Sequence, residues 1–374
     1  MATINAYKMD GLGNDFIIID RRSNPINLTK DKIIELGKRS NIGFDQIIFI
    51  EKEKENSFPI TIFNSDGGEV SACGNGSRCV AYLLSKNLNA NQIKLKTSNR
   101  VLNAKIVDNL MVELEMGKPL FDFKDIPISK IENPADVSLD IKGKKFTGGF
   151  CLNVGNPHIV FFVDDCFKYD LKVIGPLIEN HELFPEKTNV TFAQILDKRN
   201  VLVNVWERGA GLTKACGTAA CATAVAGNKN KLVENKVAIK FKEGVLNIVL
   251  DEKNNIFMTG PVSEIKNIKV EILNGCGIKG VAAKTSEFLR SKHRIDVIRS
   301  DNADKYDYSK TIIIGRNEDL DKILSVSKAF DISINNTNHI QHIPDETLGV
   351  DVTIILGKDI NSFTHISEYI LQSQ

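Results

Sequence analysis

Two cysteines stand in closely matched surroundings. Cys73 lies in ACGNGSRC and Cys216 in ACGTAACA, and each is followed by glycine, small residues and an apolar run with helical spacing. A cysteine at a helix N-terminus meets unpaired backbone N–H groups and the positive end of the helix dipole, and both favour the thiolate. Each cysteine is therefore a candidate base or nucleophile.

The match between the two cysteine segments continues along the chain. Asn14 in GLGNDFIIID corresponds to Asn156 in NVGNPHIVFFVD, and the offset stays at 142–144 residues for more than a hundred residues. A constant offset of this length indicates an internal duplication and is too long for a solenoid repeat. The sequence predicts two homologous domains that face one another, each of which offers one cysteine.

The composition argues against several classes of protein. The chain has 374 residues, a net charge of +1 and seven cysteines. Interspersed charges leave no basic face for nucleic acid, and no apolar run approaches the roughly 18 residues of a membrane span. The N-terminus lacks a signal-peptide pattern, and an odd number of cysteines suits a reducing compartment. The cysteines lack zinc-site spacing. We expect a cytoplasmic protein without a metal, a nucleic-acid partner or a membrane anchor.

The expected fold class is α+β, with each half a mostly antiparallel sheet around one central helix. For the first half, residues 1–117, the predicted strands are 4–8, 16–20, 47–51, 60–63, 93–97, 101–107 and 111–115, and the helices 29–40 and 74–86. For the second half, residues 118–261, the predicted strands are 159–163, 201–206, 237–241, 245–250 and 256–258, and the helices 170–180 and 216–227. Residues 118–134 are expected to cross between the halves.

Residues 268–374 belong to neither repeat. Strands are expected at 268–273, 295–299, 311–315 and 350–356, and helices at 281–291 and 318–329. The order β-α-β-β-α-β predicts a small α/β domain with a split βαβ arrangement.

Paired cysteines in facing domains suit one type of reaction. A thiolate on one side of a substrate carbon removes a proton while a thiol on the other side donates one, which inverts the stereocentre without a cofactor. The hydrogen beside a carboxylate is far less acidic than a thiol, so the site must stabilise the developing charge. Backbone N–H groups at the two helix N-termini suit this task, and they belong to Asn75, Gly76, Thr218 and Ala219.

Polar residues ahead of each cysteine are candidates to bind the rest of the substrate. They are Asn14, Gln46 and Asn64 in the first half, and Asn156, Asn189, Glu207 and Arg208 in the second. Arg208 is suited to a bidentate pair with a distal carboxylate. Glu207 is suited to a substrate ammonium group, and His158 to orienting a thiol. The asparagines also have a purely structural interpretation, as turn formers with positive φ.

The segments KMDGLGNDFIIID, NSDGGEVSACGNGSRC, GNPH and ERGAGLTKACGTAACA together resemble diaminopimelate epimerases over residues 1 to about 270. The resemblance implies an isomerase that interconverts LL- and meso-diaminopimelate, a precursor of lysine and peptidoglycan, without pyridoxal phosphate and commonly as a homodimer. It implies that Cys73 and Cys216 are the base and the acid, supported by His158 and Glu207. The substrate-binding residues it implies are Asn14, Gln46, Asn64, Gly74, Asn75, Asn156, Asn189, Glu207, Arg208, Gly217 and Thr218.

Two positions depart from the family pattern, which has histidine where Asp10 stands and glutamate where Leu212 stands. The remaining chain resembles a second family. VEILNGCGIKGVAAKTSEFLRSKHRIDVI and GVDVTIILGKD are similar to the C-terminal domain of LytR-type cell-wall proteins, over about 268–357. The strand at 268–273 then has two possible places: in the first half, as part of a closing strand from 262–273, or in the extension. We expect it to be shared between them. Nothing in the sequence indicates which molecule this domain binds.

Other functions remain open at this point. A related two-cysteine enzyme, such as a proline or hydroxyproline racemase, would use the same chemistry on another substrate. A cell-wall scaffold that kept only the fold is an alternative from a different class, although the intact cysteine pair favours catalysis. A structural disulfide between Cys73 and Cys216 is the main non-catalytic interpretation of the pair.

Overall fold

The computed structural model describes residues 5–38, 42–71, 73–108, 110–129, 133–242, 244–264, 266–293 and 295–372. The chain divides into two compact units. The first contains residues 1–28 and 45–263, and thus both expected halves apart from residues 29–44; the second contains residues 29–44 and 264–374. Within the described residues, we find no helix whose length and apolar character would suffice to cross a membrane.

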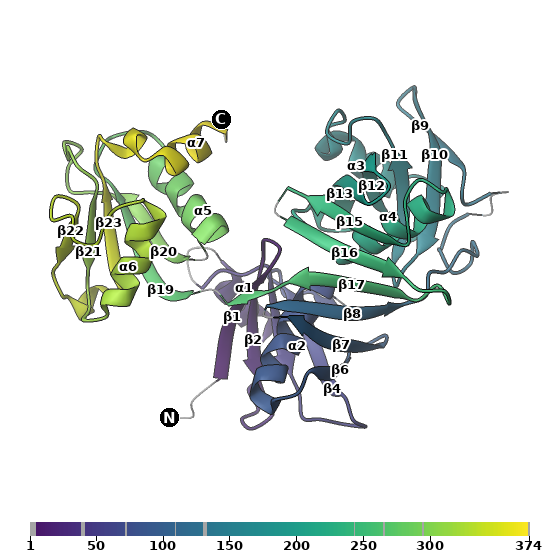
Figure 1. Cartoon of the computed structure of the whole chain (residues 1–374), viewed down its shortest axis with the longest axis horizontal. Coiled ribbons are helices and arrows are strands. Elements are labelled where there is room, and N and C mark those ends of the chain that lie inside the picture. The colour runs from purple at the N-terminus through teal and green to yellow at the C-terminus, as the bar shows by residue number, and fades with distance from the viewer. Residues whose placement is uncertain are drawn as a thin grey trace. The chain divides into compact units, whose positions relative to one another are not determined.

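The first half contains eight strands and one long helix in the first unit (Figure 1). The strands are β1 (Asn5–Gly11), β2 (Asn14–Asp20), β3 (Gln46–Ile50), β4 (Phe58–Asn64), β5 (Glu69–Val70), β6 (Gln92–Lys96), β7 (Val101–Asp108) and β8 (Met111–Gly117), and the helix is α2 (Gly74–Leu88).

The second half repeats this order and adds one strand, β9, before it. The strands are β9 (Val137–Ile141), β10 (Lys144–Asn153), β11 (Pro157–Phe162), β12 (Asn189–Asp197), β13 (Asn200–Glu207), β14 (Gly211–Leu212), β15 (Lys236–Phe241), β16 (Gly244–Leu250) and β17 (Ile256–Pro261). The helices are α3 (Leu171–Glu179) and α4 (Gly217–Lys229).

Strand pairing is the same in the two halves. β2 runs parallel to β3, as β11 does to β12, and β3 is antiparallel to β4, as β12 is to β13. The parallel pair β4 and β6 corresponds to β13 and β15, and antiparallel hairpins follow in both halves. The duplication inferred from the sequence is therefore a duplication of topology.

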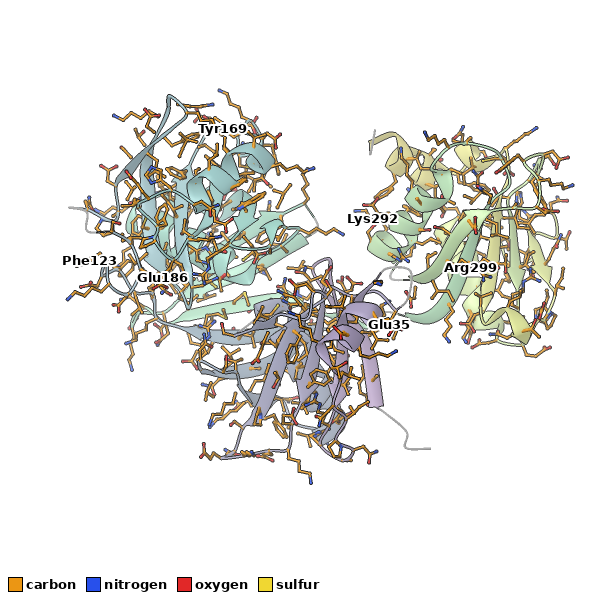
Figure 2. The ribbon with its side chains drawn as sticks, turned by 180° about the vertical axis from the view of Figure 1, so that it is seen from behind. Glu35, Phe123, Tyr169, Glu186, Lys292 and Arg299 are labelled. Carbon is orange, nitrogen blue, oxygen red and sulfur yellow. The ribbon has the colours of Figure 1, made fainter. Side chains whose placement is uncertain are left out.

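Each half wraps its strands around its cysteine helix (Figure 1). Helix α2 buries Val80, Ala81, Leu83 and Leu84, and α4 is made of small residues that are almost all buried. The two helices share one hydrophobic core, whereas a separate aromatic core lies under α3. Tyr169, labelled in Figure 2, packs against that second core, with its ring centroid 5.2 Å from that of Phe192 and the two rings tilted by 35°. Burial of both cysteine helices fixes where their first turns lie.

The halves are joined through their last strands. β17 pairs with β8 in antiparallel register from Ile256 against Gly117 to Pro261 against Met111. The final strand of the second half thus extends the sheet of the first, and its side chains reach the core beside α2 and α4. Met258 on β17 is fully buried there.

The second unit is built on a five-stranded sheet in the order β20-β19-β23-β21-β22. Its strands are β19 (Lys266–Asn274), β20 (Ile295–Asn302), β21 (Ile312–Gly315), β22 (Ile340–His342) and β23 (Val352–Leu356). Its helices are α1 (Lys30–Gly37), α5 (Val281–His293), α6 (Leu320–Ala329) and α7 (Thr364–Gln372), with the short 3-10 turns Glu346–Leu348 and Ile360–Ser362. On the sheet, Glu271 of β19 accepts hydrogen bonds from Thr353 at 3.0 Å and from Arg299, which is labelled in Figure 2.

The strand predicted at 268–273 lies in this sheet. β19 runs parallel to both β20 and β23, so residues 266–274 form a central strand of the second unit. The short strand β18 (Ser263–Glu264), which begins within the first unit, pairs with β1. Residues 268–273, which both resemblances claim, thus lie entirely in β19 of the second unit and are not shared.

Candidate active site

Cys73 is the N-cap residue of α2. Its Sγ accepts a hydrogen bond from the backbone N–H of Gly76 at 3.4 Å, and its extended backbone, with φ −145°, starts the helix. The strand-to-helix turn thus holds the sulfur over the first turn of the helix, as expected from the sequence.

Cys216 occupies the same place on α4. Its Sγ accepts from the N–H of Ala219 at 3.5 Å and lies 3.4 Å from the Thr218 hydroxyl. Gly76 and Ala219, which we expected to hold a substrate carboxylate, therefore direct their N–H groups to sulfur. A substrate carboxylate would therefore have to bind the other N–H groups at the start of the two helices, such as those of Gly74 and Gly217.

The two helix N-termini approach each other closely. A Cβ atom added to Gly74 would lie 3.9 Å from Cα of Gly217, and one added to Gly217 would lie 3.8 Å from Cα of Gly74. The same added atoms would lie 3.0 Å from Cε and 2.9 Å from Sδ of Met258. Glycine after each cysteine is thus required by close packing, and the first turns that begin at the two cysteines meet at one junction between the halves.

Burial outweighs the helix N-terminus in setting the thiol pKa values. Desolvation raises the pKa of Cys73 to about 11, although the Gly76 N–H and the charge of Arg78 oppose the shift. Desolvation also raises the pKa of Cys216, and the carboxylate of Glu207 adds to it. The N–H groups of the helix N-termini do lower the pKa of each thiol, as expected, but burial penalises the charge more strongly and the net shift is upward.

Glu207 connects the two cysteines. Burial raises its pKa, and a hydrogen bond from the Cys216 thiol opposes that shift. Its negative charge also acts on Cys73. In the first half the corresponding strand position is Asn64, which pairs with Gln46 just as the strand of Glu207 pairs with that of Asn189. The duplicated site is therefore asymmetric in charge.

Hydrogen bonds of asparagine side chains connect the two halves. The Asn75 amide donates to Asn14 Oδ1 at 2.8 Å and to the carbonyl of Ala215 at 3.3 Å. Asn14 in turn donates to Asp45 Oδ2 at 3.3 Å. Gln46, the next residue, donates to Asn64 Oδ1 at 2.9 Å. The predicted ligands of the first half thus gather at one end of its sheet, beside the first turn of α2.

The polar residues of the second half form a similar group. His158 Nε2 lies 2.9 Å from Asn156 Oδ1, and its strand neighbour Asn189 accepts from the backbone N–H of Arg208 at 2.9 Å. Burial and the charge of Arg208 lower the pKa of His158 to about 3, so the ring is neutral. The hydrogen bond of His158 that the structure shows goes to Asn156, which makes it a support for that asparagine.

Arg208 is exposed and reaches across its own half. Its Nη1 donates to the carbonyl of Glu186 at 2.9 Å, and Glu186 is labelled in Figure 2. The turn that carries it is fixed by Glu179, which accepts from Trp206 Nε1 at 2.7 Å and from the N–H of Gly209 at 3.0 Å. The guanidinium is thus held at the outer side of the site, where a distal substrate group would lie.

Three residues at the site were missed from the sequence. Asp45 holds Asn14, Met258 fills the space at the helix junction, and Arg78 is fully buried next to Asn75. Only Asp45 had a signal, since it directly precedes the predicted ligand Gln46. The others depend on the packing of β17 against α2, which no local pattern reveals.

The two residues that depart from the family pattern, Asp10 and Leu212, differ in how exposed they are. Asp10 is buried, and its carboxylate accepts from the N–H of Gly13 at 3.3 Å, so it stabilises the turn before Asn14. Leu212 is 44% exposed on β14, opposite Trp206. Asp10 therefore has a structural partner, whereas nothing in the structure explains Leu212.

The duplicated topology of the first unit is a fold that solved structures share. A protein from Pseudomonas aeruginosa described as a predicted epimerase matches with a TM-score of 0.51 at 14% identity, over 70% of this chain and 97% of that one. A hydroxyproline epimerase from Agrobacterium vitis matches with a TM-score of 0.50 at 12% identity, over 70% of this chain and 90% of that one.

Sequence similarity defines the family more narrowly. Residues 6–121 and 150–265 match the sequence model of the family described as diaminopimelate epimerase. A diaminopimelate epimerase of Pelagibacter ubique is 55% identical over 272 residues, which cover 72% of this chain and 99% of that protein. One of Carboxydothermus hydrogenoformans is 40% identical, over 68% and 94%. The chain belongs to the diaminopimelate epimerase family.

The C-terminal resemblance is also confirmed. Residues 267–359 match the family described as LytR cell envelope-related transcriptional attenuator. The match ends before α7 begins at Thr364. The second unit therefore combines this domain with a terminal helix that lies outside the matched region.

Proposed function

We propose that the protein interconverts LL- and meso-diaminopimelate at a site built on Cys73 and Cys216, without pyridoxal phosphate. The observation that carries the proposal is the junction of Gly74 and Gly217, where two N-cap cysteines lie on opposite sides of one duplicated core. Membership of the epimerase family supports the choice of substrate.

In the proposed reaction, one cysteine thiolate removes the α-hydrogen of the substrate. The electron pair of the broken C–H bond stays on the α-carbon and is delocalised into the adjacent carboxylate, which free backbone N–H groups of the two first turns hold. The other cysteine, as a thiol, donates its proton to the opposite face of the carbon. The configuration is inverted, and the two cysteines have exchanged protonation states.

The ionisation of the pair depends on Glu207. Its carboxylate accepts from the Cys216 thiol, which keeps that cysteine protonated while Cys73 lies nearer to the charge of Arg78. We infer that Cys73 is the thiolate in the resting pair and Cys216 the thiol. Because the free-protein pKa of Cys73 is about 11, the thiolate forms efficiently only with substrate bound or at alkaline pH.

The remaining polar residues are proposed to select the substrate. The amides of Asn14, Gln46, Asn64, Asn156 and Asn189 are proposed to contact its carboxylate and ammonium groups, and Arg208 its distal carboxylate. Position along the sheets supports this arrangement, because these residues lie at the strand ends that flank the two first turns.

Turnover of two substrates tests the proposal. We expect conversion of LL-diaminopimelate, followed by chiral chromatography under reducing conditions, and no conversion of trans-4-hydroxyproline. Cys73→Ala and Cys216→Ala should each reduce the rate by at least about a thousandfold, because either half-reaction then lacks its acid or base. Cys276→Ala, a half-buried cysteine of the second unit, is the control and should leave the rate unchanged. Turnover of hydroxyproline alone would favour the racemase alternative, and turnover of neither substrate would favour the scaffold.

The oligomeric state and the cellular location are also proposals. We infer a homodimer in the cytoplasm, since the chain belongs to the family of biosynthetic diaminopimelate epimerases. Light scattering of the purified protein tests the first inference: a mass near twice the 41.5 kDa of one chain supports it, and a mass near 41.5 kDa contradicts it.

A further inference from the structure

Arg78 is a buried arginine in the helix that begins after Cys73. Its side chain is 0% exposed, and it is the largest of the fully buried side chains. Its Nη2 donates to Asn75 Oδ1 at 3.0 Å, and its Nη1 lies 3.8 Å from the sulfur of Met258. Burying a guanidinium group is costly unless its contacts compensate, so these partners call for an explanation.

The contact with Asn75 determines which way that amide points. A guanidinium group only donates hydrogen bonds, so the Asn75 oxygen must face it. The Asn75 nitrogen must then face the opposite way, where it donates to Asn14 Oδ1 at 2.8 Å and to the carbonyl of Ala215 at 3.3 Å. Arg78 therefore fixes a contact between the halves directly before Cys216.

Arg78 also touches the strand that joins the halves. A Cβ atom added to Gly260 on β17 would lie 3.0 Å from Cζ and from Nε of Arg78. Met258, two residues earlier, packs between Gly74 and Gly217. The guanidinium thus lies against the segment that fills the space beneath both cysteine helices.

The charge of Arg78 acts on the catalytic cysteine of its own helix, Cys73. The groups whose charge interacts with Arg78 are Cys73, Cys79, Cys221 and Asp10. At Cys73 the arginine lowers the thiol pKa against the effect of burial. The groups that act on Cys216 are instead Glu207, Thr218 and the N–H of Ala219. The duplicated site therefore has its buried cation on the side of Cys73.

We propose that Arg78 is a positioning residue for the two-cysteine reaction: it orients Asn75, holds the first turns of α2 and α4 in register through Asn75 and Met258, and places its charge beneath Cys73. The inference deepens the proposed function and rests on it for the reaction. Its effect on Cys73 is independent of which substrate is turned over.

Two substitutions separate charge from hydrogen bonding. Arg78→Met removes both but keeps most of the apolar volume, and Arg78→Lys keeps the charge without the guanidinium geometry. Arg21→Met is the matched control. Arg21 is also largely buried, packs on Phe49 at 3.7 Å and lies in the first half, but it pairs with Glu51 away from the cysteines.

The decisive readout is the pH profile of alkylation by iodoacetamide, measured separately at Cys73 and Cys216 by mass spectrometry of the full-length protein. In Arg78→Met we expect the Cys73 profile to move by roughly one pH unit to higher pH, the size typical of a lost neighbouring charge, and that of Cys216 to stay. Arg78→Lys should restore the Cys73 profile. Arg21→Met should change neither.

Turnover of diaminopimelate gives the second readout. Loss of the Asn75 orientation should reduce kcat in Arg78→Met by about a hundredfold, and Arg78→Lys should recover only part of this loss. Equal shifts of both alkylation profiles, or wild-type profiles and wild-type kcat in a folded Arg78→Met, would overturn the inference. If the wild type itself turns over no diaminopimelate, the proposed function fails, while the alkylation profiles still decide the role of Arg78.

Discussion

Glu207 and Asn64 occupy matching strand positions in the two halves, yet one carries a charge and the other does not. This single difference breaks the symmetry of a duplicated site. The Glu207 carboxylate accepts from the Cys216 thiol and raises the pKa of both cysteines. A duplicated fold supplies two similar sulfurs, and substitutions around them assign different tasks to each.

Replacing Glu207 by Gln tests this assignment. The change removes the negative charge, so the pKa of Cys73 should fall and its alkylation at pH 8 should become faster. Turnover should nevertheless decrease by at least about tenfold, because Cys216 loses the acceptor that orients its proton. Glu113→Gln on β8, away from both cysteines, is the control. Slower alkylation of Cys73 in Glu207→Gln would contradict the account.

The buried ring of His158 predicts a pH-dependent stability. Its pKa is about 3 in the folded protein against 6.5 for an ordinary histidine, so the unfolded chain binds more protons between these values. Stability is therefore lost as pH falls from 6.5 towards 3, by up to about 5 kcal/mol. Urea unfolding at pH 7 and pH 4.5 should show a smaller decrease for His158→Gln than for the wild type. An equal decrease in both proteins would refute the assignment.

At the scale of secondary-structure elements, the positions of the first turns of α2 and α4 depend on the strands that pack around these helices. The cysteine helices, their N-terminal cysteines and most strands were predictable, because glycine and small residues before an apolar run mark a helix start. The pairing of Gly74 with Gly217 was not predictable, since it depends on β17 joining the sheet of the first half. A long-range strand pair leaves no local pattern.

Four strands of the second half were not predicted: β9, β10, β12 and β14. β9 alternates buried and exposed residues from Val137 to Ile141, which is a strand pattern, but it directly follows the proline-containing segment that was expected to be a crossover. β12 begins with the polar Asn189 after the positive-φ turn at Lys187, so its start resembles a loop. The duplication itself predicts β12, because β3 stands at the matching position.

The close approach of the helices makes Gly217→Ala a sharp test at this scale. The added methyl group would lie 2.9 Å from Met258 Sδ, so the two first turns must separate or Met258 must move. Turnover should fall by about a hundredfold, as expected for a small misplacement of catalytic groups. Adding Met258→Val to Gly217→Ala should restore part of the rate. Strictly additive effects in this double-mutant cycle would show that the two residues do not interact.

For the whole molecule, the two compact units correspond to two families. Every predicted site residue, from Asn14 to Thr218, lies in the first unit, and the Pelagibacter ubique relative is matched almost completely by 272 residues of this chain. The second unit has its own sheet and core. Catalysis and the cell-envelope-related domain are thus separate in structure, although the chain links them.

Removing most of the second unit should therefore spare the reaction. A chain that ends after Asn274 keeps both cysteine helices, β17 and β18, and should retain turnover of diaminopimelate within about fivefold, with KM more affected than kcat. The comparison requires matched circular dichroism spectra to show that the shortened chain is folded. A folded but inactive shortened chain would mean that the second unit contributes to the site.

Transfer of two different hydrogens at two sulfurs is the central claim, and isotope incorporation tests it most directly. LL-diaminopimelate is incubated in deuterated water, and deuterium at the α-carbon is measured separately in substrate and product at low conversion. The account predicts product that carries deuterium while the remaining substrate retains its original hydrogen, since one cysteine removes it and the other supplies a solvent-derived one. Product that retains the original hydrogen would show that a single base acts on both faces, and would contradict the account.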